Sequence, residues 1–251
     1  KLFLKAQINN IINIDDKYGE KLYKELRADN IKCVSYSIDK EADYRAEKLY
    51  TGVNGTSFDL IFNGVRSKVR TKTPGRFSVH NSLATIAAAH SLGISIDDII
   101  KALNINKGVE GRFEVLETNL DCTIILDFAH TPDGLEKVMQ TINEFAKGRK
   151  IVLFGAGGER DASRRSLMGE VAGRYCDFCV LTSDNPRFED PYKICEEIAE
   201  GVKQHHDNYK IIIERDKAIE YVIENYKSKD VILLAGKSTE PYQVIGSEKV
   251  P

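Results

Sequence analysis

The residues best suited to chemistry are charged side chains that follow short apolar runs in the second half of the chain. Asp127 and His130 come directly after one run, and a turn with Asp184, Asn185 and Arg187 follows another. An arginine can hold a carboxylate through two parallel hydrogen bonds, and an aspartate can accept hydrogen bonds from an ammonium group. The turn therefore suits a ligand with charges of both signs, and an ordinary Asx-Pro turn is the equally weighted alternative.

A glycine-rich turn, residues 155–161, lies after a third run. Such a turn can cradle an anion because the free N–H groups of the following helix point outward. The third glycine of the dinucleotide-binding pattern would fall at Arg160, so the turn fails that pattern and argues against a Rossmann oxidoreductase. Arg164 and Arg165 follow in the first turn of an expected helix, where cations oppose the helix dipole. An anionic ligand explains these arginines better than helix capping does.

Weaker signals come from three other places. Gly236 and Glu240 bracket a Gly-Lys-Ser sequence, but Val231 stands where a P-loop needs its first glycine, so we reject a P-loop. Asn81 lies near the start of an expected helix, where it would either cap that helix or meet an adenine edge. Arg112 lies where the sequence pattern changes, and an arginine at such a boundary can reach a ligand.

The second half of the chain predicts a scaffold for these residues through a strict alternation of apolar runs and helical patterns. The expected strands cover residues 123–126, 151–154, 178–181, 211–213 and 231–235, and the expected helices cover 132–146, 164–174, 191–205 and 217–226. Near-continuous Val, Ile and Leu runs are typical of strands buried on both faces, which indicates an α/β fold with a doubly wound, mostly parallel sheet. Ligands bind at the carboxyl ends of the strands in such sheets.

The start of the helix at 132–146 leaves two residues without a structural duty. Thr131 suits the N-cap and Pro132 suits the first helical position. Asp127 could accept hydrogen bonds from ribose hydroxyls, or it could be a solvated turn residue. His130 could likewise serve a ligand or be structural, and the spacing alone does not decide between these interpretations.

The first half of the chain is less regular. Strands are expected at residues 10–14, 31–38, 58–62 and 65–69, and helices at 18–26, 81–91 and 96–103. Asn63 and Gly64 predict a type I′ hairpin turn because both tolerate a positive φ. Gly93 and Ser95 are typical of a helix end and of the start of the next helix. A boundary at residues 107–111 predicts two domains, 1–107 and 108–251.

Composition argues against several classes of protein. The net charge is −2 and charges of both signs are interspersed, so nothing indicates a nucleic-acid partner or a polybasic membrane segment. No apolar run approaches the ~20 residues of a membrane span, and no secretion signal is present, so we expect a cytoplasmic protein. Cys176 and Cys179 are expected to be buried structural cysteines, not a redox pair or a zinc site. The chain begins without Met inside an amphipathic stretch, which suggests a fragment.

Six motifs, in their order along nearly the whole chain, resemble those of the Mur ligases. They are residues 13–16, 77–81 with 83–84, 108–114, 127–133, 155–161 and 184–187. Each motif is weak alone, but the ordered set is specific. The resemblance implies a C-terminal Rossmann-like domain, residues 108–251, preceded by the tail of the family's central ATP-binding domain, residues 1–107.

The resemblance also implies an activity. The family phosphorylates a substrate carboxylate with ATP, and the amine of an incoming amino acid then attacks the acyl phosphate to form an amide. The Asp-Asn-Pro-Arg form of residues 184–187 resembles that of members that add meso-diaminopimelate to UDP-N-acetylmuramoyl-L-alanyl-D-glutamate in peptidoglycan synthesis. An L-lysine-adding or other Mur ligase and a non-catalytic Rossmann-like binding module are the alternatives. The implied cofactors are ATP and Mg²⁺, with the P-loop and the magnesium ligands expected upstream of this chain, and the implied state is a monomer.

Residue roles carry over to the matching positions. Asn81 would contact adenine, Asp127 the ribose, Arg112 and His130 the nucleotide region, and Arg164 would stand at a basic position near the phosphates. The implied catalytic residues are Arg112, His130 and Arg164. The residues implied to bind the incoming amino acid are Arg160, Asp184, Asn185, Arg187, Gly236 and Glu240. The pair Ser238 and Thr239 departs from the Gly-His that is usual in the family, beside Glu240.

The charges agree with meso-diaminopimelate as the incoming amino acid. Arg160 and Arg187 suit its distal carboxylate, and Asp184 suits its distal ammonium group. Lysine has no distal carboxylate, so it would leave Arg187 unpaired.

Overall fold

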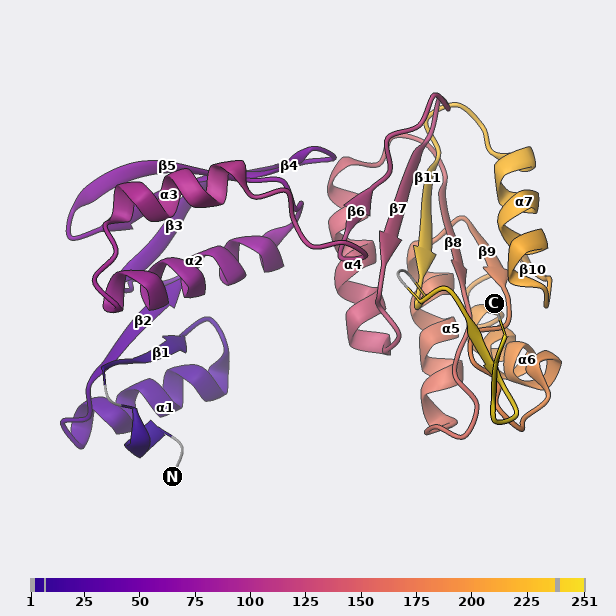
Figure 1. Ribbon diagram of the computed structural model, residues 1–251, viewed down its shortest axis with the longest axis horizontal. Helices are drawn as coiled ribbons and strands as arrows, with labels where there is room; N and C mark the ends of the chain where they lie inside the picture. The colour runs from indigo at the N-terminus through magenta and orange to yellow at the C-terminus, as the bar shows by residue number, and fades with distance from the viewer. Residues whose placement is uncertain (1–2, 7, 238–239, 251) are drawn as a thin grey trace. The chain divides into compact units, whose positions relative to one another are not determined.

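The computed structural model describes residues 3–6, 8–237 and 240–250. The chain divides into two compact units, residues 1–108 and 109–251, and each unit is described by itself (Figure 1). The unusual pair Ser238 and Thr239 lies outside the described residues.

A five-stranded mixed sheet forms the centre of the first unit, in the order β1-β2-β3-β4-β5. Its strands are β1 (Asn10–Asn13), β2 (Cys33–Ser37), β3 (Tyr44–Gly52), β4 (Gly55–Phe62) and β5 (Val65–Thr71). The pairs β1–β2 and β2–β3 are parallel, whereas β3–β4 and β4–β5 are antiparallel. The sequence analysis missed β3, because a bulge between Glu47 and Tyr50 interrupts its alternation of inward and outward side chains.

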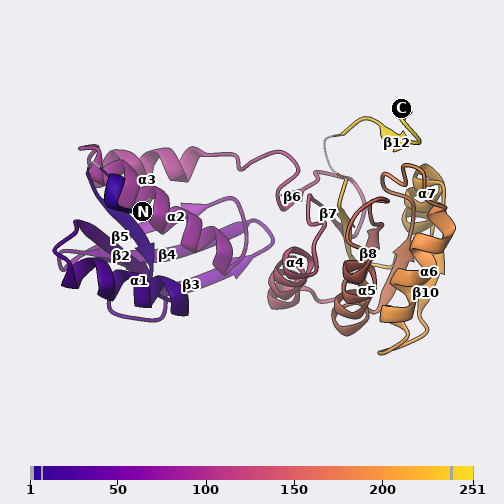
Figure 2. The ribbon, with the colours of Figure 1, turned by 90° about the horizontal axis from the view of Figure 1, so that it is seen from below.

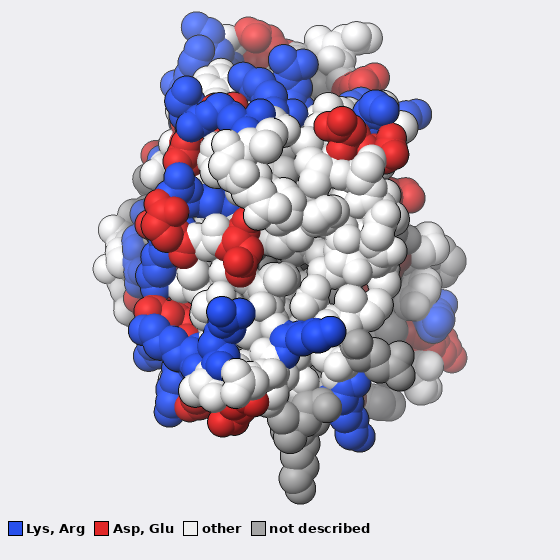
Figure 3. Space-filling view, turned by 90° about the vertical axis from the view of Figure 1, so that its left-hand side faces the viewer, with Lys and Arg blue, Asp and Glu red and all other residues white. Residues whose placement is uncertain are grey.

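Helices cover both faces of this sheet (Figure 2). Successive residues of a strand point to opposite faces of the sheet. In β1, Ile12 packs with α1 (Lys17–Ala28). Its neighbour Ile11 packs on the other face, against the core formed with α2 (Arg76–Ser91) and α3 (Ile96–Ile105). A short 3₁₀ helix, η1 (Phe3–Lys5), precedes β1. On the face drawn in Figure 3, basic and acidic side chains are mixed around a broad uncharged area.

The turns of the first unit follow the predicted chemistry with one exception. Asn63 and Gly64 have φ values of 49° and 74°, which confirms the I′-type hairpin turn. The Ser95 side chain accepts from the Asp98 N–H at the start of α3, as predicted. The prediction that Asn81 could cap a helix is wrong, because α2 begins at Arg76 and Asn81 lies exposed in its second turn. The helix starts earlier because Gly75, at φ 91°, redirects the chain just before it.

A six-stranded sheet forms the centre of the second unit, in the order β10-β9-β8-β11-β7-β6. Its strands are β6 (Glu114–Val115), β7 (Thr123–Asp127), β8 (Lys150–Phe154), β9 (Phe178–Leu181), β10 (Tyr209–Ile211) and β11 (Val231–Ala235). Every neighbouring pair is parallel except β6–β7. The mostly parallel α/β sheet is therefore confirmed, with β10 two residues earlier than predicted.

Helices also cover both faces of the second sheet, which confirms the doubly wound architecture. The four helices are α4 (Pro132–Phe145), α5 (Ser163–Tyr175), α6 (Pro191–Val202) and α7 (Arg215–Asn225). From α7, Ala218 and Val222 pack on the face that carries Ile151 and Ile232, while α4, α5 and α6 pack together on the opposite face. The Thr131 side chain accepts from the Gly134 N–H, so the predicted cap of α4 is confirmed.

Two local features complete the second unit. Cys176 and Cys179 are free and buried, as predicted, and burial raises the pKa of the Cys176 thiol well above its ordinary value, so Cys176 is not poised as a thiolate. After β11, the chain forms a small antiparallel hairpin of β12 (Gln243–Ile245) and β13 (Glu248–Val250), which the sequence did not predict.

Candidate functional site

Two loops at the carboxyl ends of β8 and β9 lie in direct contact because glycines leave no side chain between them. A Cβ on Gly155 would lie 2.1 Å from the Thr182 carbonyl oxygen, and a Cβ on Gly158 would lie 1.9 Å from the Pro186 carbonyl oxygen. The Gly158 N–H donates to the Asn185 carbonyl oxygen at 2.9 Å. The glycine-rich turn therefore supports the neighbouring loop through close backbone contact.

A pocket of about 550 Å³ opens at these loops, which is within the usual size range of small-molecule sites. It is lined by Phe128, His130, Gly155, Ala156, Gly157, Arg160, Asp161, Arg164, Arg165, Met168, Asp184, Asn185, Arg187, Gly236 and Glu240. The lining comes from α5 and from the loops that follow β7, β8, β9 and β11, four adjacent strands of the sheet. Eight of the eleven residues that the resemblance assigned to catalysis or binding line this pocket, and the three that do not are Asn81, Arg112 and Asp127.

Charges of opposite sign stand at this pocket without a direct ion pair between described residues. Asp184 does act electrostatically on the buried guanidinium of Arg215, because burial lowers the pKa of Arg215 and the Asp184 charge counteracts part of that effect. Among the residues that the structure describes, neither the Arg160 guanidinium nor the Asp184 carboxylate has an ion-pair or side-chain hydrogen-bond partner. A Cβ on Gly157 would lie 3.2 Å from Arg187 Nη1 and 3.6 Å from Arg160 Cγ, so both arginines approach the same glycine. Arg187 Nη1 donates to the Gly158 carbonyl oxygen at 2.7 Å, which leaves its other donors for a ligand.

The Asn185 side chain has one possible role toward a ligand. Its Oδ1 accepts from the Val244 N–H at 2.8 Å and from Lys237 Nζ at 3.1 Å, so this atom must be the oxygen and both its lone pairs are engaged. Its Nδ2 lies 3.4 Å from Glu240 Oε2. Asn185 can therefore donate to a ligand carboxylate, but it cannot accept from an ammonium group.

Lys237 is a residue that the sequence analysis did not assign. Its Nζ lies 2.9 Å from Glu240 Oε2, and only 7% of its side chain is exposed. The hydrogen bond from Lys237 is the main reason that the pKa of Glu240 lies below its ordinary value. The available signal was the position of Lys237 two residues after the end of a buried strand and three residues before Glu240.

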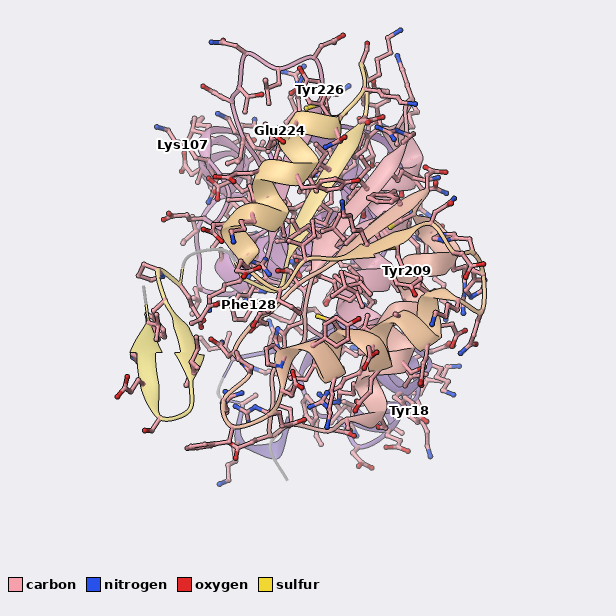
Figure 4. The ribbon with its side chains drawn as sticks, turned by 90° about the vertical axis from the view of Figure 1, so that its right-hand side faces the viewer. Tyr18, Lys107, Phe128, Tyr209, Glu224 and Tyr226 are labelled. Atoms are coloured by element: carbon pink, nitrogen blue, oxygen red, sulfur yellow. The ribbon has the colours of Figure 1, made fainter. Side chains whose placement is uncertain are left out.

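His130 and Arg112 flank Phe128 at the end of β7, a residue labelled in Figure 4. His130 Nδ1 lies 2.9 Å from the Phe128 carbonyl oxygen, which can only accept, so Nδ1 carries the proton and Nε2 of the neutral ring is an acceptor. The Arg112 guanidinium lies over the Phe128 ring, 4.8 Å from its centroid. Both side chains are exposed, so both can reach a ligand.

Comparison with known proteins gives the site a context. Residues 111–238 match the family described as the Mur ligase, glutamate ligase domain, and residues 1–89 match the Mur ligase middle domain. The chain belongs to the Mur ligase family. It is 41% identical to the UDP-N-acetylmuramoyl-L-alanyl-D-glutamate--2,6-diaminopimelate ligase of Clostridioides difficile (strain 630), with 99% of this chain and 51% of that protein covered.

Two further relatives carry the same description. The Alkaliphilus oremlandii (strain OhILAs) protein is 44% identical, with 99% of this chain and 51% of that protein covered. A solved structure of such a ligase is 30% identical with a TM-score of 0.66, with 97% of this chain and 50% of that chain covered. The chain thus spans about half the length of the curated relatives that it matches. Among the described residues of this Mur ligase, no helix combines the length and the apolar character needed to cross a membrane.

Asp127, predicted to meet a ribose, is engaged within the Mur ligase fold. It is 7% exposed, and its carboxylate accepts from the Phe113 N–H at 2.8 Å and from the Ala129 N–H at 2.7 Å. Burial raises the pKa of Asp127 above its ordinary value, although these N–H groups and Arg112 counteract part of that effect. The structure thus gives Asp127 a local role in shaping the loop, and its contact with ribose stays a prediction.

The two arginines in the first turn of α5 differ in their partners. Arg164 is exposed and pairs with Asp161, with Nε and Oδ2 3.3 Å apart, an exposed pair of the kind that adds little stability. Arg165 has a side chain only 4% exposed, and it pairs with Glu189 at 2.8 Å and Glu197 at 3.0 Å. The interpretation that Arg165 needs an anionic ligand is wrong, because the chain supplies two carboxylates.

The sequence did contain a signal for the burial of Arg165. Position 165 lies on the same helical face as the buried residues Met168 and Ala172, three and seven positions later. Glu189 also accepts from the Glu159 N–H, so Arg165 helps to join the two contacting loops. Arg165 is therefore a structural part of the pocket wall.

Proposed function

We propose that this Mur ligase chain supplies the amino-acid-binding part of an ATP-dependent ligase that adds meso-diaminopimelate to UDP-N-acetylmuramoyl-L-alanyl-D-glutamate in peptidoglycan synthesis. In this proposal residues 108–251 form the amino-acid-binding domain, and residues 1–107 form the C-terminal part of the ATP-binding domain. The protein acts in the cytoplasm as a monomer. The names of relatives 41% and 44% identical along nearly this whole chain support the proposal.

The single observation that carries the proposal is the set of unpaired opposite charges around one pocket. Arg160 and the free donors of Arg187 suit the distal carboxylate of meso-diaminopimelate, and Asp184 suits the distal ammonium group. Asn185 can add only a donor, so it belongs with the arginines on the carboxylate side. An amino acid without a second zwitterionic end would leave these charges without a partner, which would cost most at the partly buried Arg187 and Asp184.

The same residues would orient the nucleophile. In an amide-forming ligase, ATP supplies the phosphoryl group that activates the acceptor carboxylate. This chain would hold the distal end of the amino acid in the pocket, which presents the amine at the other end of the molecule for attack. Such positioning converts a bimolecular step into an effectively unimolecular one. Glu240, held beside Lys237, and Gly236 complete the proposed amino-acid site.

The nucleotide-facing part of the proposal rests on Asn81, Arg112, Asp127, His130 and Arg164. An exposed guanidinium stacked on an aromatic ring, an exposed imidazole and a basic residue in the first turn of α5 are chemically suited to a nucleotide and its phosphates. Asn81 presents an exposed amide, which can pair with a base edge. Mg²⁺ would accompany the nucleotide, since magnesium is commonly bound together with substrate phosphates.

Calorimetric titration of the purified chain with meso-diaminopimelate and with L-lysine tests the binding proposal. We expect heat of binding with meso-diaminopimelate and at least about 100-fold weaker binding of L-lysine, because a site built to hydrogen-bond a group rejects an analogue that lacks it. Amide formation by a ligase that contains this chain, followed with labelled amino acid, tests the activity. Equal or tighter binding of L-lysine would refute the assignment of the amino acid.

A further inference from the structure

Residues 243–246, which include β12, lie along the loop 183–187 of the pocket and are hydrogen-bonded to it. The Arg187 N–H donates to the Val244 carbonyl oxygen at 3.0 Å, and the Gly246 N–H donates to the Arg187 carbonyl oxygen at 2.7 Å. Gln243 Nε2 donates to the Ser183 carbonyl oxygen at 3.0 Å. Figure 4 shows the hairpin as a separate two-stranded ribbon to the left of Phe128.

The contact continues into the side chain of a pocket residue. The Val244 N–H donates to Asn185 Oδ1 at 2.8 Å, and Lys237 Nζ donates to the same atom at 3.1 Å. These two donors fix the amide so that its NH₂ group, and not its oxygen, is available near Glu240. The hydrogen bond from residue 244, together with that from Lys237, thus determines what Asn185 can offer a ligand.

The backbone of the loop also needs external support at Arg187. Its φ is 52°, a left-handed conformation that a non-glycine residue keeps only where the surroundings impose it. Both backbone polar groups of Arg187 bond to residues 244 and 246, and its Nη1 bonds to Gly158. The direction of the guanidinium therefore depends on contacts from two sides.

We propose that residues 243–246 are a clasp that positions Asn185 and Arg187 for the distal carboxylate of the incoming amino acid. Gln243 and the N–H of Val244 act in this clasp as positioning groups, since neither lines the pocket. The inference rests on the proposed function, because it concerns the selectivity of the same pocket. The clasp orders the carboxylate-binding side, whereas Asp184, on the ammonium side, has no hydrogen bond to it among the described residues.

Substituting proline at position 244 isolates one hydrogen bond of the clasp. The N–H and carbonyl of Val244 both face the loop, so Val244 and its partner Lys249 form a non-hydrogen-bonded pair of the hairpin. Val244→Pro therefore removes the donor to Asn185 without breaking the ladder between β12 and β13. Val244→Ala is the matched reference, because it shortens the same side chain and keeps the N–H.

The measurement is the affinity of each purified variant for meso-diaminopimelate and for L-lysine by calorimetry. We expect Val244→Pro to bind meso-diaminopimelate about tenfold more weakly than Val244→Ala does, because about one hydrogen bond is lost. The weak affinity for L-lysine should be the same in both variants. Hydrogen exchange at the Arg187 amide should become faster in Val244→Pro. Equal affinity of the two variants for meso-diaminopimelate would overturn the clasp.

A second variant keeps the test decisive if Val244→Pro does not fold. Gln243→Glu retains the size of the side chain but cannot donate to the Ser183 carbonyl, so it should also weaken meso-diaminopimelate binding by about tenfold relative to wild type. Unchanged affinity in a folded Gln243→Glu protein would likewise contradict the clasp. If the wild-type chain itself fails to bind meso-diaminopimelate, the proposed function fails, which separates that outcome from a failure of the clasp.

Discussion

Gly158→Ala should disable the pocket by separating its two contacting loops. The added Cβ would lie 1.9 Å from the Pro186 carbonyl oxygen, whereas real contacts of this kind stay above 3.0 Å. The loops must therefore move apart by at least 3.0 − 1.9 = 1.1 Å. That shift lengthens the Gly158–Asn185 hydrogen bond from 2.9 Å beyond bonding range and displaces the carbonyl that holds Arg187 Nη1.

A displacement of this size has a large functional effect. Misplacing a binding group by about 1 Å can cost about 100-fold, so we expect kcat/KM for meso-diaminopimelate to fall by about that factor in a ligase that contains this chain. Overpacking should cost about 1–3 kcal/mol of stability, which thermal unfolding would report separately. The measurement is steady-state amide formation at varied meso-diaminopimelate concentration.

Gly157→Ala is the matched control for this experiment. Its Cβ would meet Arg187 Nη1 at 3.2 Å and Arg160 Cγ at 3.6 Å, and a flexible side chain can move away from such a contact. Because those side chains are proposed ligand contacts, we expect some loss of kcat/KM, smaller than that of Gly158→Ala, without the loss of stability that overpacking against the backbone causes. A folded Gly158→Ala enzyme with wild-type kcat/KM would show that the loop contact does not position the site.

Three further substitutions test other parts of the argument. Arg187→Lys keeps the charge but loses the two-pronged geometry, so meso-diaminopimelate should bind about 10–100-fold more weakly by calorimetry while L-lysine binding is unchanged. Asp230 is 1% exposed and pairs with Arg149 at 2.6 Å. Asp230→Ala should lower the free energy of unfolding, measured by urea titration, by about 3 kcal/mol. Burial alone would raise the pKa of Asp230, but hydrogen bonds from Arg149 and from backbone N–H groups hold this pKa below 3.8. The stabilisation by the ion pair should therefore persist above pH 3.8 and disappear as the pH falls through the lowered pKa of Asp230. Arg165→Met should cost only about 1 kcal/mol in thermal unfolding, because its partner glutamates are partly exposed and can be hydrated.

The sequence was sufficient for the parallel sheet because its strands are buried on both faces. Continuous apolar runs such as 151–154 and 231–235 are typical of strands covered by helices on both faces. Both runs form strands within one residue of the predicted bounds. The pocket could be anticipated for the same reason, since polar residues that directly follow parallel strands meet at one edge of the sheet. That rule brought Arg160 and Asp184 to the same pocket although they are distant in sequence.

Features that depend on tertiary contacts could not be anticipated. The hairpin after Glu240 consists of two three-residue strands, one half-buried and one exposed, and the pairing of residues 243–246 with loop 183–187 leaves no apolar pattern in the sequence. The orientation of the Asn185 amide is set by Lys237 and by the Val244 N–H, and the latter is a donor that every residue except proline carries. The early start of α2 followed from the conformation of Gly75, and local propensity around Asn81 did not reveal it.

In the proposed function, the donors and acceptors left free at the pocket decide which amino acid it can select. On one side, Arg160, the remaining nitrogens of Arg187 and the NH₂ of Asn185 can only donate. On the other side, the Asp184 carboxylate can only accept, and no described side chain forms a hydrogen bond or a direct ion pair with it, although its charge acts on the buried guanidinium of Arg215. A ligand that satisfies both sides must carry an acceptor and a donor close together at its distal end, as the amino-acid head of meso-diaminopimelate does. Lysine offers the ammonium group alone, so its binding would leave two guanidinium groups without a counter-charge. Arg160 is exposed and stays hydrated, so the penalty falls mainly on the partly buried Arg187. In the proposed function this penalty, more than any steric exclusion, should make the site reject lysine.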